Sequence, residues 1–398
     1  MTPDPSDSPL PAEPRLVATQ EDFAGLVEEL KRETVLAVDT EAASFHRHLD
    51  RIYLIQVSTR ETTAIIDPVA VSDLRGFGAL LADPAIEIVF HDADYDLRLF
   101  DLQYGFRATR LFDTRIAAEL TNEPGLSLAA LLEKHLGVKV DKRYQRADWS
   151  SRPLTPAMLA YAAGDTSHLV ALRDLMAERV TAIGRMAWAL EEFEELTRVR
   201  WVTDPDREPG WLRIKGAKAL PPRELAILRE LHRWREEVAQ RTDRAEFRIM
   251  GNEALLAIAR AAPDSAEKLG AIKGVGKETA ERRGRAILSA IKRGQKVPEK
   301  DLPRVERAPR RQREPEVEAR LARLKTARTD ITSRLELAPG VVCPNSVLES
   351  IARQVPETLE GLSMIPGIRR WQVASFGDEL LAAVRNGTGM KEGTRELE

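Results

Sequence analysis

Two acidic residues stand where an apolar run ends near the start of the chain. Asp39 and Glu41 follow segment 35–38, which has the composition of a buried β-strand. Side chains two positions apart on a strand point to the same face, so these carboxylates lie side by side and repel each other. A hard cation such as Mg²⁺ removes that repulsion, because it prefers carboxylate oxygens. The pair is a candidate metal site, although strand ends also carry exposed acids and this spacing leaves both interpretations open.

A second acidic segment, 91–97, lies where an expected strand gives way to a helix. It contains Asp92, Asp94 and Asp96, and one of these three acids is expected to face the site. A helix that begins near Asp94 would use this residue as its N-cap and leave Asp92 exposed in the loop. Asp96 would then lie in the first turn and face the site. The spacing of the three acids does not choose among them.

Tyr161 and Asp165 form the third candidate pair. The apolar pattern of 156–180 predicts a helix with Thr155 as its N-cap and Pro156 directly behind it. Residues four apart on a helix share a face, so the hydroxyl and the carboxylate lie together. A half-buried ring beside a solvated acid is the alternative that this spacing leaves open.

The elements that must position these residues alternate between strands and helices, which indicates an α/β domain. Apolar and β-branched runs predict strands at 35–38, 52–58, 65–66 and 86–90. Helical spacing predicts helices at 74–81, from 95 onward, and at 111–120, 127–136 and 156–180.

From residue 220 onward helical patterns replace the strand signals, and the sequence repeats itself at a constant offset without gaps. Such a repeat predicts two small helical modules. The first copy contains Ile258, Ala259, Arg260, Pro263, Leu269, Ile272, Gly274 and Gly284. The second contains, in the same order, Ile351, Ala352, Arg353, Pro356, Leu362, Ile365, Gly367 and Gly377.

Composition sets broader limits. No apolar run approaches the roughly 20 residues of a membrane span, and 1–14 lacks the pattern of a signal peptide, so we expect a disordered leader. Cys343 is the only cysteine, which excludes an internal disulfide and suits the cytoplasm. The net charge is −3, yet Lys and Arg gather at 198–218, 273–293 and 304–313. This asymmetry indicates carboxylate chemistry in the N-terminal half of the chain and phosphate contacts in the C-terminal half.

Three motifs occur in the order typical of the DEDD superfamily of 3′-to-5′ exonucleases. They are Val38-Asp39-Thr40-Glu41, His91-x4-Asp96-Leu97 and Tyr161-x3-Asp165. Further stretches resemble the ribonuclease D family, so that the likeness covers most of 35–175. These stretches are Leu54-Ile55-Gln56-Val57, Ile66-Asp67-Pro68, Phe112-Asp113-Thr114, Leu126-Ser127-Leu128 and Asp148-Trp149. One sub-branch has a histidine where this chain has Ala160, so the resemblance is to the tyrosine branch.

The resemblance implies a ribonuclease H-like mixed sheet flanked by helices, and a site that binds two divalent ions, Mg²⁺ or Mn²⁺. Its metal ligands would be Asp39, Glu41, Asp96 and Asp165. Asp96 is thereby selected over Asp92 and Asp94. His91 and Asp113 also match the family, and we expect a structural hydrogen bond from the first and a strand-end or helix-cap role for the second.

The family's chemistry assigns a role to each matched residue. Asp39, Glu41 and Asp165 would hold the ion that activates water, with Asp39 bridging to the second ion and Asp96 acting through bound water. Tyr161 would orient the attacking water, because a phenol with a pKa near 10 is a poor general base.

Segment 223–294 resembles an HRDC domain, a module that binds or positions nucleic acid. Its candidate phosphate-binding turn consists of Lys273, Gly274, Gly276 and Lys277. The second copy departs from it, with Ile368 and Arg369 in place of Val275 and Gly276, which weakens the same expectation there.

In front, basic residues close to the catalytic helix are the candidates for RNA phosphate contacts, namely Lys142, Arg143 and Arg146. Phe45 could stack the last base, although an aromatic residue after a strand is more often part of the core.

These observations predict a metal-dependent 3′-to-5′ exoribonuclease that releases nucleoside 5′-monophosphates and trims tRNA precursors and other structured RNAs, with RNA as partner and a monomer favoured. A DNA exonuclease is one alternative, because only contacts to the 2′-hydroxyl discriminate. A non-catalytic RNA-binding scaffold is the other. The expected divisions are a leader at 1–14, an exonuclease domain at 15–200, HRDC-like modules at 220–296 and 316–386, linkers at 201–219 and 297–315, and a tail at 387–398.

Overall fold

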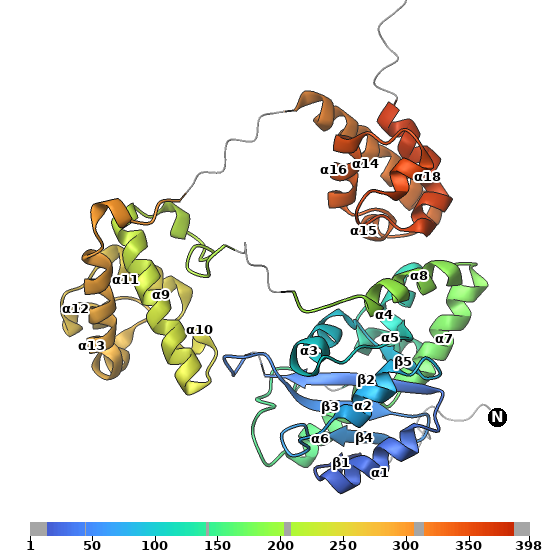
Figure 1. The fold of residues 1–398 in the computed structure, drawn as a ribbon, viewed down its shortest axis with the longest axis horizontal. Coiled ribbons are helices and arrows are strands. Elements are labelled where there is room, and N and C mark those ends of the chain that lie inside the picture. Colours follow the sequence, from blue (N-terminus) through green and yellow to red (C-terminus); the bar gives the residue numbers. More distant parts are fainter. Residues whose placement is uncertain (1–13, 44, 141–142, 203–207, 306–313, 386–398) are drawn as a thin grey trace, which may run out of the picture.

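The structure, a computed structural model, describes residues 14–43, 45–140, 143–202, 208–305 and 314–385. An N-terminal α/β domain and two helical modules follow one another along the chain (Figure 1). None of the described helices is long and apolar enough to cross a membrane.

A six-stranded mixed sheet forms the centre of the first domain, in the order β1-β4-β3-β2-β5-β6. β3 runs antiparallel to its neighbours β2 and β4, and the other pairs are parallel. The central strands are apolar runs buried on both faces, which suits a sheet covered by helices. The expected ribonuclease H-like mixed sheet is confirmed. The strands are β1 (Arg15–Val17), β2 (Val35–Ala42), β3 (Ile52–Ser58), β4 (Thr63–Ile66), β5 (Glu87–Phe90) and β6 (Leu111–Asp113).

Helices flank this sheet. They are α1 (Gln20–Leu30), α2 (Arg75–Ala82), α3 (Asp94–Tyr104), α4 (Thr114–Leu120), α5 (Leu128–Leu136), α6 (Pro156–Gly164), α7 (Leu169–Ala182) and α8 (Met186–Thr197). Most of the predicted elements are confirmed to within a few residues, whereas β1 and α1 had not been predicted.

The helix predicted at 111–120 is partly wrong. Its first residues form β6, where Leu111 and Phe112 are buried beside β5. The helix begins only at Thr114, because the Asp113 carboxylate accepts hydrogen bonds from the first backbone N–H groups of α4. The role expected for Asp113 is thus confirmed.

The helix predicted at 156–180 is interrupted at 165–168. Ser58 Oγ on β3 donates to Thr166 Oγ1 at 2.7 Å, which ties this turn to the sheet. Asp165 is therefore the C-cap of α6 and not an interior helical residue. The apolar pattern continues through the turn, so periodicity alone does not reveal the break.

The two modules share one arrangement of helices around separate apolar cores, which confirms the repeat. Ile214 and Ala217, inside the expected linker 201–219, are buried in the first core, so part of this segment packs with the module. The first module contains η2 (Ala217–Ala219), α9 (Pro222–Thr242), α10 (Glu246–Ile249), α11 (Asn252–Ala261), α12 (Ala266–Gly270), α13 (Gly276–Gln295) and η3 (Glu299–Asp301). The second contains α14 (Pro315–Leu335), α15 (Pro339–Val342), α16 (Asn345–Gln354), α17 (Leu359–Ser363) and α18 (Arg370–Arg385).

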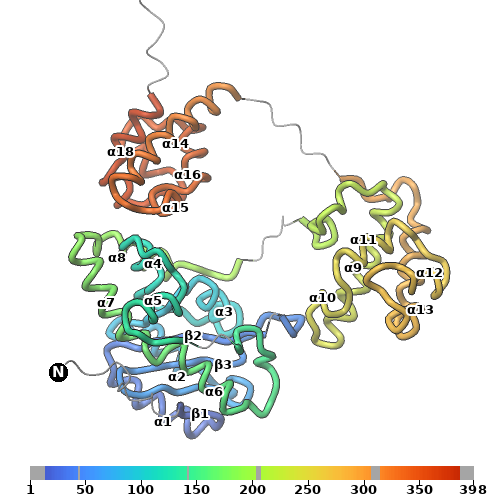
Figure 2. The backbone as a smooth tube through the Cα atoms, turned by 180° about the vertical axis from the view of Figure 1, so that it is seen from behind, coloured from blue at the N-terminus to red at the C-terminus, as the bar shows by residue number. Residues whose placement is uncertain are grey.

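Each module contacts the α/β domain at a different place. In the first module, α10 lies beside the loop that follows β2, where Ala245 N donates to His46 O at 3.1 Å (Figure 2). In the second, the start of α18 faces α8, and the rings of Trp371 and Trp188 stack at 4.5 Å.

Candidate active site

A cleft of about 410 Å³ brings together residues of all three motifs, with His91 from the second, although Asp96 is not among the residues that line it. Asp39 and Glu41 project from the C-terminal half of β2, and Tyr161 and Asp165 come from α6 and its C-cap. Tyr161 and Asp165 were expected to lie on one face of a helix, and both side chains do line the cleft. Asp165, however, follows the last helical residue of α6.

Four carboxyl groups dominate this region, Asp96 buried and the other three partly buried. Burial is the main cause that raises the pKa of each of four carboxyl groups, and the charge of Asp165 adds to the shift of Asp39. The pKa of Asp165 rises to about 7. Within the part of the chain that the structure describes, no lysine or arginine lowers the pKa of any of the four. The four groups are Asp39, Glu41, Asp96 and Asp165.

Asp96 differs in environment from the two acids that competed with it. It is only 7% exposed, and the Thr40 hydroxyl donates to its Oδ1. Asp94 pairs with Arg98 along α3 at 2.6 Å, and it is the first helical residue and not the N-cap predicted for it. The Asp92 side chain is 62% exposed. Burial next to β2 therefore favours Asp96, the acid that the resemblance selects.

Aromatic packing fixes Tyr161. Its ring centroid lies 5.8 Å from that of Trp149 and 5.9 Å from that of Tyr144. Arg152 holds this loop in place, because it donates to both oxygens of Asp67 at 2.7 and 2.8 Å and to the Trp149 carbonyl at 2.7 Å. A bidentate guanidinium–carboxylate pair of this kind restricts both partners, so the ring has a defined place in the cleft.

Known proteins match both parts of the chain. A 3′-5′ exonuclease family model matches residues 14–181, and the HRDC domain model matches 224–291 and 317–384. A ribonuclease D of Gluconacetobacter diazotrophicus is 32% identical over 373 residues, which cover 93% of this chain and 92% of that protein. The chain belongs to the ribonuclease D family. It is accordingly a hydrolytic 3′-to-5′ exoribonuclease.

Solved structures agree. The chain is similar to a protein from Bifidobacterium adolescentis, with a TM-score of 0.81, 25% identity and coverage of 94% and 97%. It is also similar to the catalytic core of RRP6 from Trypanosoma brucei, with a TM-score of 0.65 and 28% sequence identity. This match covers 72% of this chain and 81% of the RRP6 chain. A third similar structure is Escherichia coli RNase D, described as an exoribonuclease involved in structured RNA processing. The TM-score is 0.68 and the sequence identity 24%, over 94% of this chain and 99% of that chain, so the similarity is one of fold.

Membership of the ribonuclease D family implies dependence on divalent metal, and the donors here fit such an ion. They are carboxylate oxygens, which hard cations prefer, and their charge is not neutralised by the described basic residues. Gln56, opposite Asp39 on β3, is fully buried, and its amide has no hydrogen-bond partner among the described residues. No three described Asp, Glu, His or Cys side chains are already gathered around one point. The cleft thus brings carboxylate oxygens near one another, but the described side chains do not form a complete metal-coordination site.

His91 makes the structural hydrogen bond expected of it. Its Nδ1 lies 2.9 Å from Thr114 Oγ1, and this hydroxyl donates to the Phe90 carbonyl at 3.1 Å. Burial is the main cause that lowers the pKa of His91 to about 4, so the ring is neutral near pH 7.

The candidate RNA-contact residues of this domain lie at the surface. Arg143 and Arg146 are exposed, and Lys142 lies outside the described residues. The Arg146 guanidinium packs over the Phe45 ring at 5.4 Å. Phe45 is 48% exposed, so it is not the core residue that its position after a strand favoured.

The candidate phosphate turn of the first module is exposed as well and does not line the cleft. It consists of Lys273, Gly274, Gly276 and Lys277, with α13 beginning at the second glycine. Gly274 has φ +88° and Gly276 φ +72°, values that favour glycine. Exposed Lys273 and Lys277 flank these two glycines.

Two polar residues of the cleft were missed by the motif search. Arg115 on α4 lines the cleft and pairs with exposed Asp92 at 3.5 Å, and Gln145 lines it from the loop before α6. The resemblance covered their neighbours, but neither residue stands at a motif position. Their only sequence signal was polarity close to matched segments.

Proposed function

We propose that this chain trims the 3′ ends of tRNA precursors and other structured RNAs and releases nucleoside 5′-monophosphates. The observation that carries the proposal is the set of buried and partly buried carboxylates whose charge no described basic residue neutralises. Two divalent ions, Mg²⁺ or Mn²⁺, would be held by the carboxylates of Asp39, Glu41, Asp96 and Asp165. When bound, such ions promote ionisation of water and offset charge on the phosphate. Two HRDC modules behind the nuclease support a structured substrate.

The chain's own residues would orient the reactants. Trp149 and Arg152 fix the ring of Tyr161, so its hydroxyl can hold the attacking water by a hydrogen bond instead of acting as a base. Thr40 holds the Asp96 carboxylate in one orientation. The Ser58–Thr166 hydrogen bond fixes the turn that presents Asp165.

The test uses tRNA precursors with 3′ extensions, incubated with Mg²⁺ or Mn²⁺ and with EDTA. We expect metal-dependent shortening that releases mononucleotides and stops near the mature end. Asp39→Asn should abolish shortening while RNA binding persists, and Asp92→Asn, which changes an exposed acid at the same cleft, should not.

Matched RNA and DNA oligonucleotides complete the experiment. Faster digestion of DNA would overturn the RNA substrate, and binding without any cleavage by the metal-loaded wild type would support a scaffold instead. Shortening that continues unchanged in EDTA would contradict the metal-dependent reaction.

A further inference from the structure

The junction between the first module and the nuclease lies next to the catalytic strand. Ala245 N donates to His46 O at 3.1 Å, and Arg248 Nε donates to Phe45 O at 2.5 Å. Phe45 follows Glu41 by four residues, so their Cα atoms are at most about 14 Å apart. Whatever occupies this junction is therefore close to the cleft.

Two half-exposed aromatic rings meet at the junction. Phe45 is 48% exposed and Phe247 54%, although their ring centroids lie only 6.4 Å apart. A guanidinium packs on each ring, Arg146 at 5.4 Å from the Phe45 centroid and Arg248 at 5.9 Å from that of Phe247. Packing of the two domains alone would bury these rings, whereas here each keeps about half of its surface in solvent.

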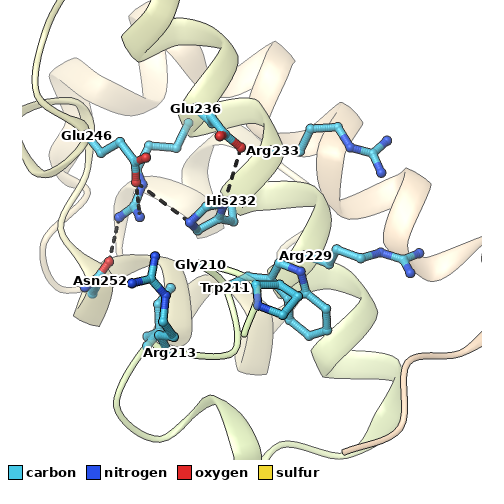
Figure 3. Close-up of a pocket in the computed structure, with 12 residues that line it drawn as sticks. Gly210, Trp211, Arg213, Arg229, His232, Arg233, Glu236, Glu246 and Asn252 are labelled. Carbon is cyan, nitrogen blue, oxygen red and sulfur yellow. Dashed lines mark hydrogen bonds and ion pairs between the residues drawn. The ribbon is translucent and has the colours of Figure 1, made fainter. Parts of the chain in front are cut away.

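The interior of the first module sets the orientation of α10. Arg235, only 4% exposed, donates to Glu246 Oε2 at 2.7 Å, to Asn252 Oδ1 at 2.7 Å and to the Met250 carbonyl at 3.1 Å. In Figure 3, dashed lines mark the hydrogen bonds that Glu246 and Asn252 accept. Glu246 directly precedes Phe247, so its ion pair with the buried Arg235 fixes the segment that carries the exposed ring.

The second module has the equivalent arginine–asparagine hydrogen bond but lacks the exposed aromatic and basic side chains of α10. Arg328 Nη1 donates to Asn345 Oδ1 at 2.9 Å, as Arg235 does to Asn252. Where the first module has Glu246, Phe247 and Arg248, the repeat places Pro339, Gly340 and Val341 in the second. The aromatic and basic groups are thus additions to the shared fold, and only the module beside the cleft loop has them.

We propose that Phe45, Phe247, Arg146 and Arg248 form a subsite for single-stranded RNA upstream of the 3′ end that is being cut. The inference rests on the RNA trimming proposed above. Bases stack on the half-exposed rings, which is how proteins hold unpaired RNA without reading its sequence, and the guanidinium groups contact phosphates. RNA in this subsite bridges the nuclease and the first module, so it feeds the strand toward the cleft.

The test separates base stacking from domain packing at Phe247. Phe247→Leu keeps an apolar side chain but removes the aromatic face, and Phe247→Trp keeps both. Binding of a single-stranded oligoribonucleotide is measured with the full chain in an Asp39→Asn background, which prevents cleavage. We expect Phe247→Leu to weaken binding by roughly tenfold to a hundredfold and Phe247→Trp to retain it. Leu102→Ala, which trims an exposed apolar residue of α3, is the control and should bind like the parent.

A second readout is hydrolysis of a dinucleotide by chains with an intact Asp39, since a dinucleotide fills only the cleft. The Phe247 variants should cleave it at the parent rate, whereas a parent that shortens no RNA in the presence of Mg²⁺ or Mn²⁺ would contradict the proposed function and not the subsite. Equal binding by the parent and Phe247→Leu would overturn the subsite. Equal losses in the Leu and Trp variants would overturn it too, because they would assign Phe247 to domain packing.

Discussion

The nuclease domain carries two groups of carboxylates in opposite situations. In the cleft, Asp39 and Asp165 are partly buried, and their charge has no counterpart among the described basic residues. On α8, Glu192 accepts hydrogen bonds at 2.9 Å from Arg369 Nε and from Trp371 Nε1 of the second module. The described residues therefore neutralise the acids that join the domains, but they do not neutralise the cleft acids. A cation or a cation-bound substrate would supply that opposite charge.

The α8 contact also explains how the two HRDC copies diverge. The repeat aligns Arg369 and Arg370 with Gly276 and Lys277, the start of the open turn in the first module. Arg370 Nη2 lies 2.9 Å from Glu194 Oε2, so the equivalent end of the second turn is occupied by protein. The same position of the fold serves as an open basic turn in one copy and as a domain contact in the other.

The largest effect should come from the same neutralising change in each carboxylate group. Asp165→Asn should lower the RNA cleavage rate by about a thousandfold or more, because it removes a proposed metal ligand worth several kcal/mol of barrier. Glu192→Gln should change cleavage of a dinucleotide very little, since α8 lies outside the cleft. Rates are measured at saturating metal. Similar losses in the two variants would break the distinction between the groups.

The metal-free protein should show the cost of unneutralised charge as a pH dependence of stability. Burial raises the folded pKa of Asp165 to about 7, above its unfolded value near 4, so the folded state binds the proton more tightly. Stability must then fall as pH rises from about 4 to 7 and level off above, with Asp165 contributing up to about 4 kcal/mol.

Urea unfolding in EDTA at several pH values measures this effect. Asp165→Asn should flatten the profile and stabilise the metal-free chain at pH 8, and Mg²⁺ should stabilise the wild type most at high pH. A metal-free wild type that gains stability over the same range would contradict the sign.

Charge reversal tests the neutralised group. Glu192→Arg should weaken docking of the second module by about 1–3 kcal/mol, because it removes two hydrogen bonds to a charged acceptor and opposes Arg369. The double change Glu192→Arg with Arg369→Glu should recover part of the loss. Small-angle scattering in rising salt reports the opening, and Glu281→Arg on exposed α13 is the control. No difference between the single and double variants would mean that this pair does not hold the domains.

The sequence predicted those parts of the site that depend on neighbours along the chain. The strand and its pair, Asp39 and Glu41, follow from an apolar run and a two-residue period. The choice of Asp96 does not, because it depends on the Thr40 hydroxyl on another element and on Asp113, which accepts from the Asp92 and Ala93 N–H groups ahead of α3. Only the ordered family motifs selected it beforehand.

Contacts between distant segments set the rest. The break at Asp165 is invisible to periodicity, because the hydroxyl that ties the turn belongs to Ser58, more than a hundred residues earlier. The docking of Arg369 on Glu192 could not be predicted either, since a substitution in a repeat shows that a role has changed without showing the new partner. The metal ligands themselves remain a prediction that the Asp39 and Asp165 variants test.

The smallest effect should distinguish the two HRDC turns. Lys277 and Arg370 occupy equivalent positions, but Lys277 is exposed on the open turn and Arg370 pairs with Glu191 and Glu194. Lys277→Gln should make RNA binding less dependent on salt, lowering the slope of log K against log salt by about 0.7, the value for one lost phosphate contact. Arg370→Gln should leave that slope unchanged, because its charge is already satisfied by protein. Binding titrations across several salt concentrations measure both slopes, and an equal decrease in the two variants would show that the second module also holds RNA through its turn.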